Sequence, residues 1–215
     1  MKLISIILLM VCTIYGSSLE EKSSVKLIVP VYSQKVSIQL PSIDWKPVFE
    51  SNKKNTYRIE FVPKEENSRD WKNLISIQGF KSFVKDRSDK EKLSTLVKFS
   101  SLLQTNFQRI CTQDKFIFDL LDNKDEKYIY IDAIIGCTEA RNVRQDKVDV
   151  TKGEIGYYRF IAGKNDVYLI HKAVRGEEKE ILQRLNKLNA KEFFSVINPI
   201  KTCKYDKSPV NCKEE

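Results

Sequence analysis

Residues Glu154 to Arg175 read EIGYYRFIA, GKND and VYLIHKAVR, and no other part of the chain after residue 18 is as apolar over such a length. Two runs rich in β-branched and aromatic residues flank GKND, whose residues tolerate the unusual backbone angles of a tight turn. In both runs apolar side chains occupy both of the alternating faces. Because a strand with one wet face would alternate apolar and polar residues, the pattern predicts a central hairpin that is covered on both sides.

Alternation also assigns the side chains of this hairpin to faces. In the first strand, one face carries Ile155, Tyr157 and Ile161, and the other carries Tyr158, Phe160 and Ala162. In the second strand, Val167, Leu169 and Ala173 lie on one face, and Tyr168, Ile170 and Val174 lie on the other. His171, the single histidine, falls on the face of Val167 and Leu169.

Further strands are predicted on the N-terminal side of the chain. Ser23 to Pro30 is either a lead-in or a first edge strand, and Lys35 to Leu40 alternates as a strand. Asp44 to Glu50 and Thr56 to Val62 form a hairpin, with Pro47 at an edge or on a bulge because proline cannot donate to a ladder. Trp71 to Phe80 fits either a strand or a helix, and the alternation around Ile75 and Ile77 favours a strand.

A long amphipathic helix is predicted from Ser88 to Arg109. Ser88 and Glu91 form a capping box. An apolar stripe for packing on the sheet steps by three or four residues through Leu93, Leu96, Phe99, Leu103, Phe107 and Ile110.

The part of the chain after this helix is predicted to hold more strands and a second helix. Lys115 to Leu121 and Lys127 to Gly136 form a hairpin, and Ala140 to Lys152 is polar enough for a loop. A second helix begins near Glu177, where acidic residues complement the helix dipole. Its buried face is expected to hold Ile181, Leu182, Leu185 and Leu188, and a short helix follows at Lys191 to Ile197.

The order of strands, helix, four strands and helix predicts an α+β fold. We expect a mainly antiparallel sheet of about six to seven strands with two main helices packed on it and two disulfides. Residues 1–18 are predicted to be a signal peptide, 19–200 a single domain, and 201–215 a disulfide-stapled tail. The pattern is compatible with a PsbP/Mog1-like sandwich or a cystatin-like curled sheet.

The N-terminus predicts export. Lys2 precedes an apolar run from Leu3 to Tyr15 that is too short to span a bilayer, and small residues follow at Gly16 and Ser18. We expect cleavage after Ser18, with cleavage after Gly16 nearly as favourable. A retained anchor and a lipoprotein processed at Cys12 are the alternatives. The mature protein is expected in the periplasm or outside the cell, with no transmembrane segment.

The remaining cysteines fit an oxidising compartment, because an even number is left after cleavage. If Leu121 faced Lys127 in the predicted hairpin, Cys111 would face Cys137 at its open end, within reach of a disulfide. Cys203 and Cys212 would then close a small C-terminal loop.

Three segments carry a resemblance to known proteins. Tyr57 to Pro63 reads YRIEFVP, Trp71 to Gln78 reads WKNLISIQ, and the third segment is the hairpin with its flanking Gly153 and Gly176. Together with Cys111 and Cys137 they resemble a family of uncharacterised exported bacterial proteins. The resemblance implies export and a single domain, and it implies no activity or site residue.

The sequence carries few signals for catalysis. His171 lies within a strand, where a packed histidine is the alternative to a catalytic base. Asp132 lies in an apolar strand, where burial requires a partner such as Arg159 or Arg175, and a cleft acid with a raised pKa is the alternative. No motif for metal or phosphate binding is found, and the acidic turn at residues 122–126 does not have the pattern of a calcium site. We therefore expect no metal and no cofactor.

Tyrosines gather on neighbouring predicted strands, where core packing and an aromatic binding surface are the two interpretations. The candidate binding surface comprises Tyr128, Tyr130, Tyr157, Tyr158, Tyr168, Asp132, Arg159 and His171. The formal net charge of +8 comes from dispersed lysines, which fits a solvated surface or weak contact with anionic surfaces and not nucleic-acid binding.

We therefore expect an exported bacterial protein that is not an enzyme and that binds a protein or an envelope component. A carrier of a small apolar ligand between helix 88–109 and the sheet is the first alternative. A hydrolase that uses only acidic residues is the second.

Overall fold

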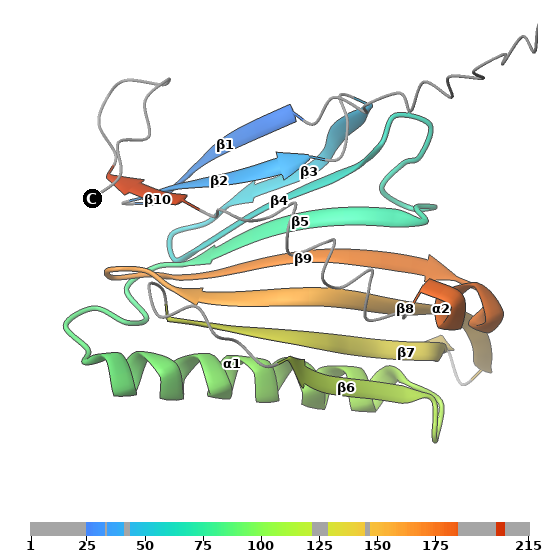
Figure 1. The fold of residues 1–215 in the computed structure, drawn as a ribbon. Coiled ribbons are helices and arrows are strands. Elements are labelled where there is room, and N and C mark those ends of the chain that lie inside the picture. Colours follow the sequence, from blue (N-terminus) through green and yellow to red (C-terminus); the bar gives the residue numbers. More distant parts are fainter. Residues whose placement is uncertain are drawn as a thin grey trace, which may run out of the picture.

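Seven strands form one antiparallel sheet in the computed structural model, which describes residues 25–32, 34–40, 44–121, 129–144, 147–184 and 201–204 (Figure 1). The strand order is β3-β4-β5-β9-β8-β7-β6. The strands are β3 (Trp45–Asn52), β4 (Thr56–Pro63), β5 (Asn73–Phe80), β6 (Phe116–Leu121), β7 (Tyr130–Arg144), β8 (Lys147–Ala162) and β9 (Val167–Gly176). With α1 (Asp89–Ile110) and α2 (Glu178–Arg184), this sheet gives the α+β fold that the sequence predicts.

The predicted central hairpin is confirmed as β8 and β9. Ala162 pairs with Val167 across the turn, and the two strands lie in the middle of the seven. The predicted faces also hold, because one core cluster contains Ile155, Tyr157 and Ile161 with Tyr168 and Ile170. A second cluster, on the opposite side, contains Tyr158 and Phe160 with Val167 and Leu169.

A smaller sheet covers one of these faces. Its order is β1-β2-β10, formed by β1 (Val25–Val31), β2 (Gln34–Leu40) and β10 (Lys201–Lys204). Val31 and Val36 of this sheet and Ile181 of α2 belong to the same core cluster as Ile77 and Tyr168. We call this side of the large sheet the closed face. Val31 approaches β5 so closely that a Cβ at Gly79 would collide with its side chain.

Helix α1 packs on the opposite side, which we call the helix face. It lies along β6, β7 and β8 (Figure 1). The predicted capping box is present, because Glu91 accepts hydrogen bonds from the backbone N–H and the hydroxyl of Ser88. The middle of the predicted stripe is buried, as at Leu96 and Phe107, whereas Leu93 and Ile110 at its ends are 47% and 48% exposed.

The predicted register between β6 and β7 is wrong. Leu121 pairs with Asp132 instead of Lys127, and Phe116, not Cys111, stands opposite Cys137. Cys111 ends α1, and residues 112–115 turn the chain into β6 through a hydrogen bond from the Lys115 N–H to the Thr112 carbonyl. The Cys111–Cys137 disulfide is nevertheless present, with Cα atoms 5.5 Å apart, because the end of α1 lies beside β7.

Two further expectations need correction. Residues 140–152 do not form a loop, because β7 continues to Arg144 and β8 begins at Lys147. Strand pairing uses the backbone and therefore tolerates polar side chains on both faces. In α2, Ile181 is buried as predicted, but Leu182 is 52% exposed.

The N-terminal strands agree with the sequence. Pro47 lies on β3, at the end of the strand order, and a register shift follows between Pro47 and Phe49. β5 confirms the strand interpretation of residues 71–80, and β1 and β2 pair as a hairpin. No helix in the described part of the chain is both long and apolar enough to cross a membrane.

Several expectations fall outside the described residues. They are the signal peptide, the acidic turn at 122–126, Tyr128, Leu185, Leu188, the short helix at 191–197, Cys212 and with it the Cys203–Cys212 disulfide.

Candidate functional site

A row of polar side chains crosses the helix face beside α1. The cross-strand register aligns Glu60 of β4, Ser76 of β5, His171 of β9 and Tyr158 of β8. Directly paired residues point to the same side of a sheet, so all four lie on the helix face. We call these four residues the polar row.

His171 is held as a buried, neutral imidazole. Its residue is 6% exposed, and its ring stacks on that of Tyr158 with centroids 4.7 Å apart. Burial lowers the pKa of His171 to about 3, and the positive charge of Arg58 contributes to this shift. The row therefore has a polar but uncharged centre at neutral pH.

Two atoms of the polar row are buried without a hydrogen-bond partner among the described residues. They are the hydroxyl Oγ of Ser76 and Nδ1 of His171. Ser76 has no exposed surface, and it stands directly opposite His171 on the neighbouring strand. Native proteins pair nearly all buried polar atoms, and an unpaired one costs about 1–3 kcal/mol. Two on adjacent strands therefore make this point of the sheet a local cost to stability.

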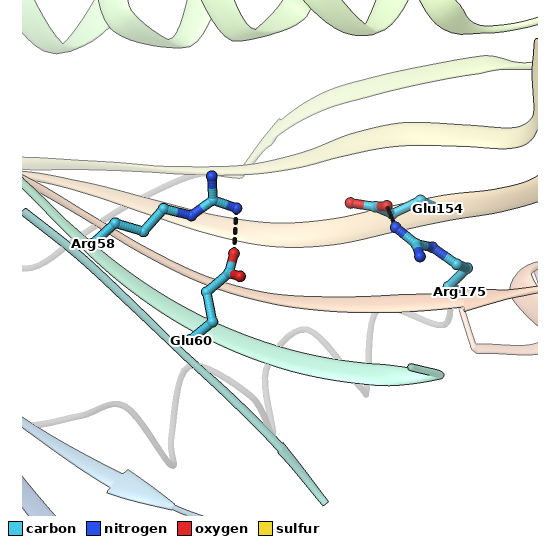
Figure 2. A network of polar contacts seen from close by, with 4 residues as sticks. All are labelled: Arg58, Glu60, Glu154 and Arg175. Carbon is cyan, nitrogen blue, oxygen red and sulfur yellow. Dashed lines mark hydrogen bonds and ion pairs between the residues drawn. The ribbon is translucent and has the colours of Figure 1, made fainter. Parts of the chain in front are cut away.

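An ion pair stands beside the row on β4. Arg58 donates to the Glu60 carboxylate, and their side chains are 48% and 13% exposed (Figure 2). The guanidinium of Arg58 also lies 5.6 Å from the centroid of the Phe49 ring. Because Arg58 uses one amino group on Glu60, its planar head keeps other N–H donors for a ligand.

A second ion pair stands on β8 and β9, four residues along these strands from Tyr158 and His171. Arg175 of β9 donates to Glu154 of β8 at 2.7 Å, and the Arg175 guanidinium lies 3.9 Å from the centroid of the Trp71 ring. Both side chains are partly exposed, at 32% for Arg175 and 26% for Glu154. Figure 2 shows the Arg58 guanidinium and the Glu154 carboxylate pointing toward one another.

One charge from each ion pair, Arg58 and Glu154, affects the pKa of Tyr158. Burial raises its pKa well above the usual value, the Glu154 charge adds to this effect, and the Arg58 charge opposes it. The ring lies back along β8, because a Cβ at Gly156 would stand 2.9 Å from the Tyr158 hydroxyl. Glycine at 156 therefore leaves the space that the Tyr158 ring occupies along β8.

Most of the candidate residues from the sequence lie on the closed face instead. Asp132 and Arg159 form a buried bidentate pair, with Nε to Oδ1 at 2.7 Å and the second amino group to Oδ2 at 2.8 Å. Burial raises the pKa of Asp132, and the Arg159 guanidinium opposes this shift. Arg159 also lies 4.4 Å from the centroid of the Tyr130 ring. Of the two partners expected for Asp132, the structure selects Arg159.

The tyrosines do not share one surface. Tyr130, Tyr157 and Tyr168 pack in or against the core of the closed face, whereas Tyr158 packs on the helix face. The Tyr157 hydroxyl donates to the Arg184 carbonyl at 2.9 Å, and Tyr168 donates to Asp166 at 3.3 Å. Of the predicted surface residues that the structure describes, only Tyr158 and His171 belong to the polar row.

Sequence reasoning missed Arg58, Glu60, Ser76 and Glu154. One signal was available, because Arg58 and Glu60 are two apart in a predicted strand and so share a face. Their meeting with Ser76 and His171 depends on pairing between distant strands, which alternation does not reveal.

The arrangement does not favour catalysis. Serine beside histidine is a pair that nucleophilic enzymes use, but Ser76 has no exposed surface and a histidine with a pKa of about 3 is a weak base. Within the described residues, no group of three or more metal-ligating side chains comes together.

Comparisons with known proteins add a likeness of fold. The structure is similar to that of Mog1. The Ran-binding protein Mog1p of Saccharomyces cerevisiae matches with a TM-score of 0.47 and 10% sequence identity, over 81% of this chain and 93% of that one. A point mutant of protein Mog1 matches with a TM-score of 0.47 and 11% identity, over 80% and 92%.

No protein-family model and no curated protein sequence matches the chain. The similarity to Mog1 assigns no family, site or activity to this chain.

Proposed function

We propose that this chain is an exported, non-enzymatic binding protein that holds its ligand with the two partly exposed ion pairs on the helix face, Arg58–Glu60 and Glu154–Arg175. The observation that carries the proposal is the presence of two partly exposed ion pairs, Arg58–Glu60 and Glu154–Arg175, on the same face of the sheet. Arg58 stands on β4 two residues before Glu60, its charge acts on His171, and its side chain is half exposed. A ligand would bind to these exposed charges, because Arg58 keeps N–H donors that its bond to Glu60 does not use.

The surrounding charges suit recognition better than chemistry. Arg58, Glu60, Glu154 and Arg175 are partly exposed and already paired, so they are positioned without a ligand and can exchange partners when one arrives. A binding face needs positioned donors and acceptors. A reaction centre would also need a reactive group that a substrate can reach, and buried Ser76 does not provide one.

The two alternatives have less support. A carrier of an apolar ligand needs space between α1 and the sheet, where Leu96, Phe107, Tyr158, Phe160 and Leu169 pack together. An acid-only hydrolase centred on Asp132 needs an accessible carboxyl, whereas Asp132 is 6% exposed and held by Arg159 at two points.

Chemical-shift mapping tests the proposal. Isotope-labelled protein is titrated with fractions of culture medium and cell envelope, and we expect at least one fraction to shift the resonances of the two ion pairs. The double variant Arg58→Gln/Glu154→Gln should lose this response. The matched variant Arg109→Gln/Asp119→Asn, which changes the same charges at exposed positions on α1 and β6, should keep it. Shifts that map elsewhere, or none in any fraction, would refute the binding role.

Export is tested separately. We expect material recovered outside the cytoplasm to begin at Leu19, the residue after the proposed cleavage site, when its intact mass is measured. Recovery of the full-length chain from the cytoplasm alone would remove export from the proposal.

A further inference from the structure

Three connections between elements meet at one end of the large sheet, on the left in Figure 1. They are residues 53–55 between β3 and β4, residues 81–88 between β5 and α1, and residues 163–166 between β8 and β9. Hydrogen bonds join them, because the Lys81 N–H donates to the Asn55 carbonyl at 3.0 Å and the Val84 N–H donates to the Asn165 carbonyl at 3.0 Å. The three connections therefore form one continuous surface.

The middle connection, residues 81–88, is held in place at further points. Val84 has no exposed surface, and the Ser82 N–H donates to the Asp166 carboxylate at 2.7 Å. The Arg87 side chain donates to the Thr95 hydroxyl of α1 at 2.9 Å. Because both neighbouring turns and α1 hold this connection, its exposed side chains are presented from a fixed backbone.

Exposed cations gather on this surface. The three connections carry six cations, and all six are exposed: Lys53, Lys54, Lys81, Lys85, Arg87 and Lys164. We call these six residues the basic end. Two acids lie on the same connections, of which Asp86 is exposed and Asp166 is buried. By contrast, the connection between β4 and β5 at the opposite end of the sheet, residues 64–72, carries three cations and three acids.

An exposed aromatic residue stands among these cations. Phe83 is 43% exposed, although its ring packs edge to face on Phe99 of α1, with centroids 5.1 Å apart, and on Phe80 at 6.0 Å. At the surface of an anionic bilayer, cations meet the lipid phosphates and an apolar ring can enter between the headgroups. The charges alone would suit any polyanion, and Phe83 is the feature that favours a bilayer.

From this arrangement we infer that the basic end docks on the surface of a bilayer that contains anionic phospholipids. The six cations lie near the lipid phosphates, and the Phe83 ring lies among the headgroups. This contact uses none of the four residues of the two ion pairs on the helix face, so it is independent of the proposed ligand site.

Vesicles of phosphatidylcholine, with and without phosphatidylglycerol, test the inference by co-sedimentation. We expect binding to the anionic vesicles and little to the neutral ones. Added salt should weaken the binding, because it screens the attraction between the exposed cations and the phosphates. Glycerol 3-phosphate offers the same phosphate group without a bilayer, and it should not displace the protein.

Two double variants locate the contact. Lys53→Gln/Lys85→Gln should weaken binding to the anionic vesicles about ten- to thirtyfold, because each cation near an anionic surface contributes about fivefold in affinity. Arg69→Gln/Lys179→Gln removes the same charge from exposed positions at the opposite end of the sheet and should bind like the wild type. All variants are purified in the same processed form, so they share one N-terminus, and circular dichroism shows that each is folded.

The variant Phe83→Trp reports on the aromatic contact. Anionic vesicles should shift its added fluorescence to the blue, because the indole would leave water for the headgroup layer. The native tryptophans are internal controls at the opposite end of the sheet, where Trp45 pairs with Pro63 and Trp71 precedes β5. The emission of the wild type should therefore stay unchanged.

Three results of these experiments would each overturn the inference: equal binding to neutral and anionic vesicles, equal losses in the two double variants, or no shift of emission at residue 83. A fourth would be a DNA duplex that binds as tightly as the anionic vesicles and is weakened equally by Lys53→Gln/Lys85→Gln. The basic end would then recognise polyanions in general and not a bilayer.

Discussion

The ion pairs on the closed face and on the helix face of the large sheet differ in their burial and in the number of their contacts. On the closed face, Asp132 and Arg159 meet at two points and are 6% and 4% exposed. On the helix face, Glu154 and Arg175 meet at one point and remain about a quarter to a third exposed. The first pair satisfies itself inside the core, whereas the second can exchange its partner. The comparison separates charges that hold the fold together from charges that can serve binding.

The largest effect is expected on the closed face. Arg159→Met should lower the free energy of unfolding by about 3–5 kcal/mol, because it leaves the Asp132 carboxylate buried without its partner. Arg175→Met on the helix face should cost about 1 kcal/mol or less, since its pair is partly exposed. Urea denaturation of both variants measures the difference, and equal losses would erase the distinction between the two faces.

Removal of the disulfide should cause the second-largest loss of stability. It ties the end of α1 to β7, so Cys111→Ala/Cys137→Ala is expected to cost about 2–4 kcal/mol by freeing the unfolded chain. Reducing agent should destabilise the wild type by a similar amount and leave the double variant unchanged. A wild type that is insensitive to reduction would show that α1 is held by packing alone.

Acid should lower the free energy of unfolding through the titration of His171. The pKa of His171 falls from 6.5 in the unfolded chain to about 3 in the fold, so its contribution is complete above pH 6.5 and is lost as the pH falls toward 3. Between neutral pH and about pH 4.5 this amounts to roughly 2–3 kcal/mol.

The variant His171→Phe isolates this term, because phenylalanine keeps an aromatic ring against Tyr158 but does not titrate. Its unfolding free energy should fall less with acid than that of the wild type. Parallel pH dependences in the two proteins would mean that His171 is not buried as described.

The smallest effect is expected at Ser76. Ser76→Ala removes a hydroxyl with no partner among the described residues, so stability should stay unchanged or rise by up to about 1 kcal/mol. Tyr157→Phe on the closed face removes a hydroxyl that donates to the Arg184 carbonyl and should cost about 1 kcal/mol. A loss at Ser76 that matched the loss at Tyr157 would show that the serine has a partner after all.

These contrasts also explain what the sequence could predict. The faces of the central hairpin follow from alternation within each strand, so Tyr157 and Tyr158 were assigned to opposite sides correctly. The pairing of Asp132 was expected for the same local reason, because a carboxylate in an apolar strand needs a cation nearby.

Features that depend on how segments meet were less predictable. The Cys111–Cys137 disulfide was predicted from a hairpin register that the structure does not have, since Cys111 ends a helix instead of continuing a strand. The polar row depends on β5 lying between β4 and β9, and no local pattern places Ser76 beside His171.

Pro47 has a consequence for how the molecule behaves in a crowded solution. It stands on β3, the outermost strand beside β4, where a chain from another molecule could extend the ladder. Because proline offers no N–H and the backbone steps out of register just after it, such an extension would be interrupted at its middle. We therefore expect Pro47 to hinder fibre-like stacking on this side, and a β-branched residue in its place to remove that protection.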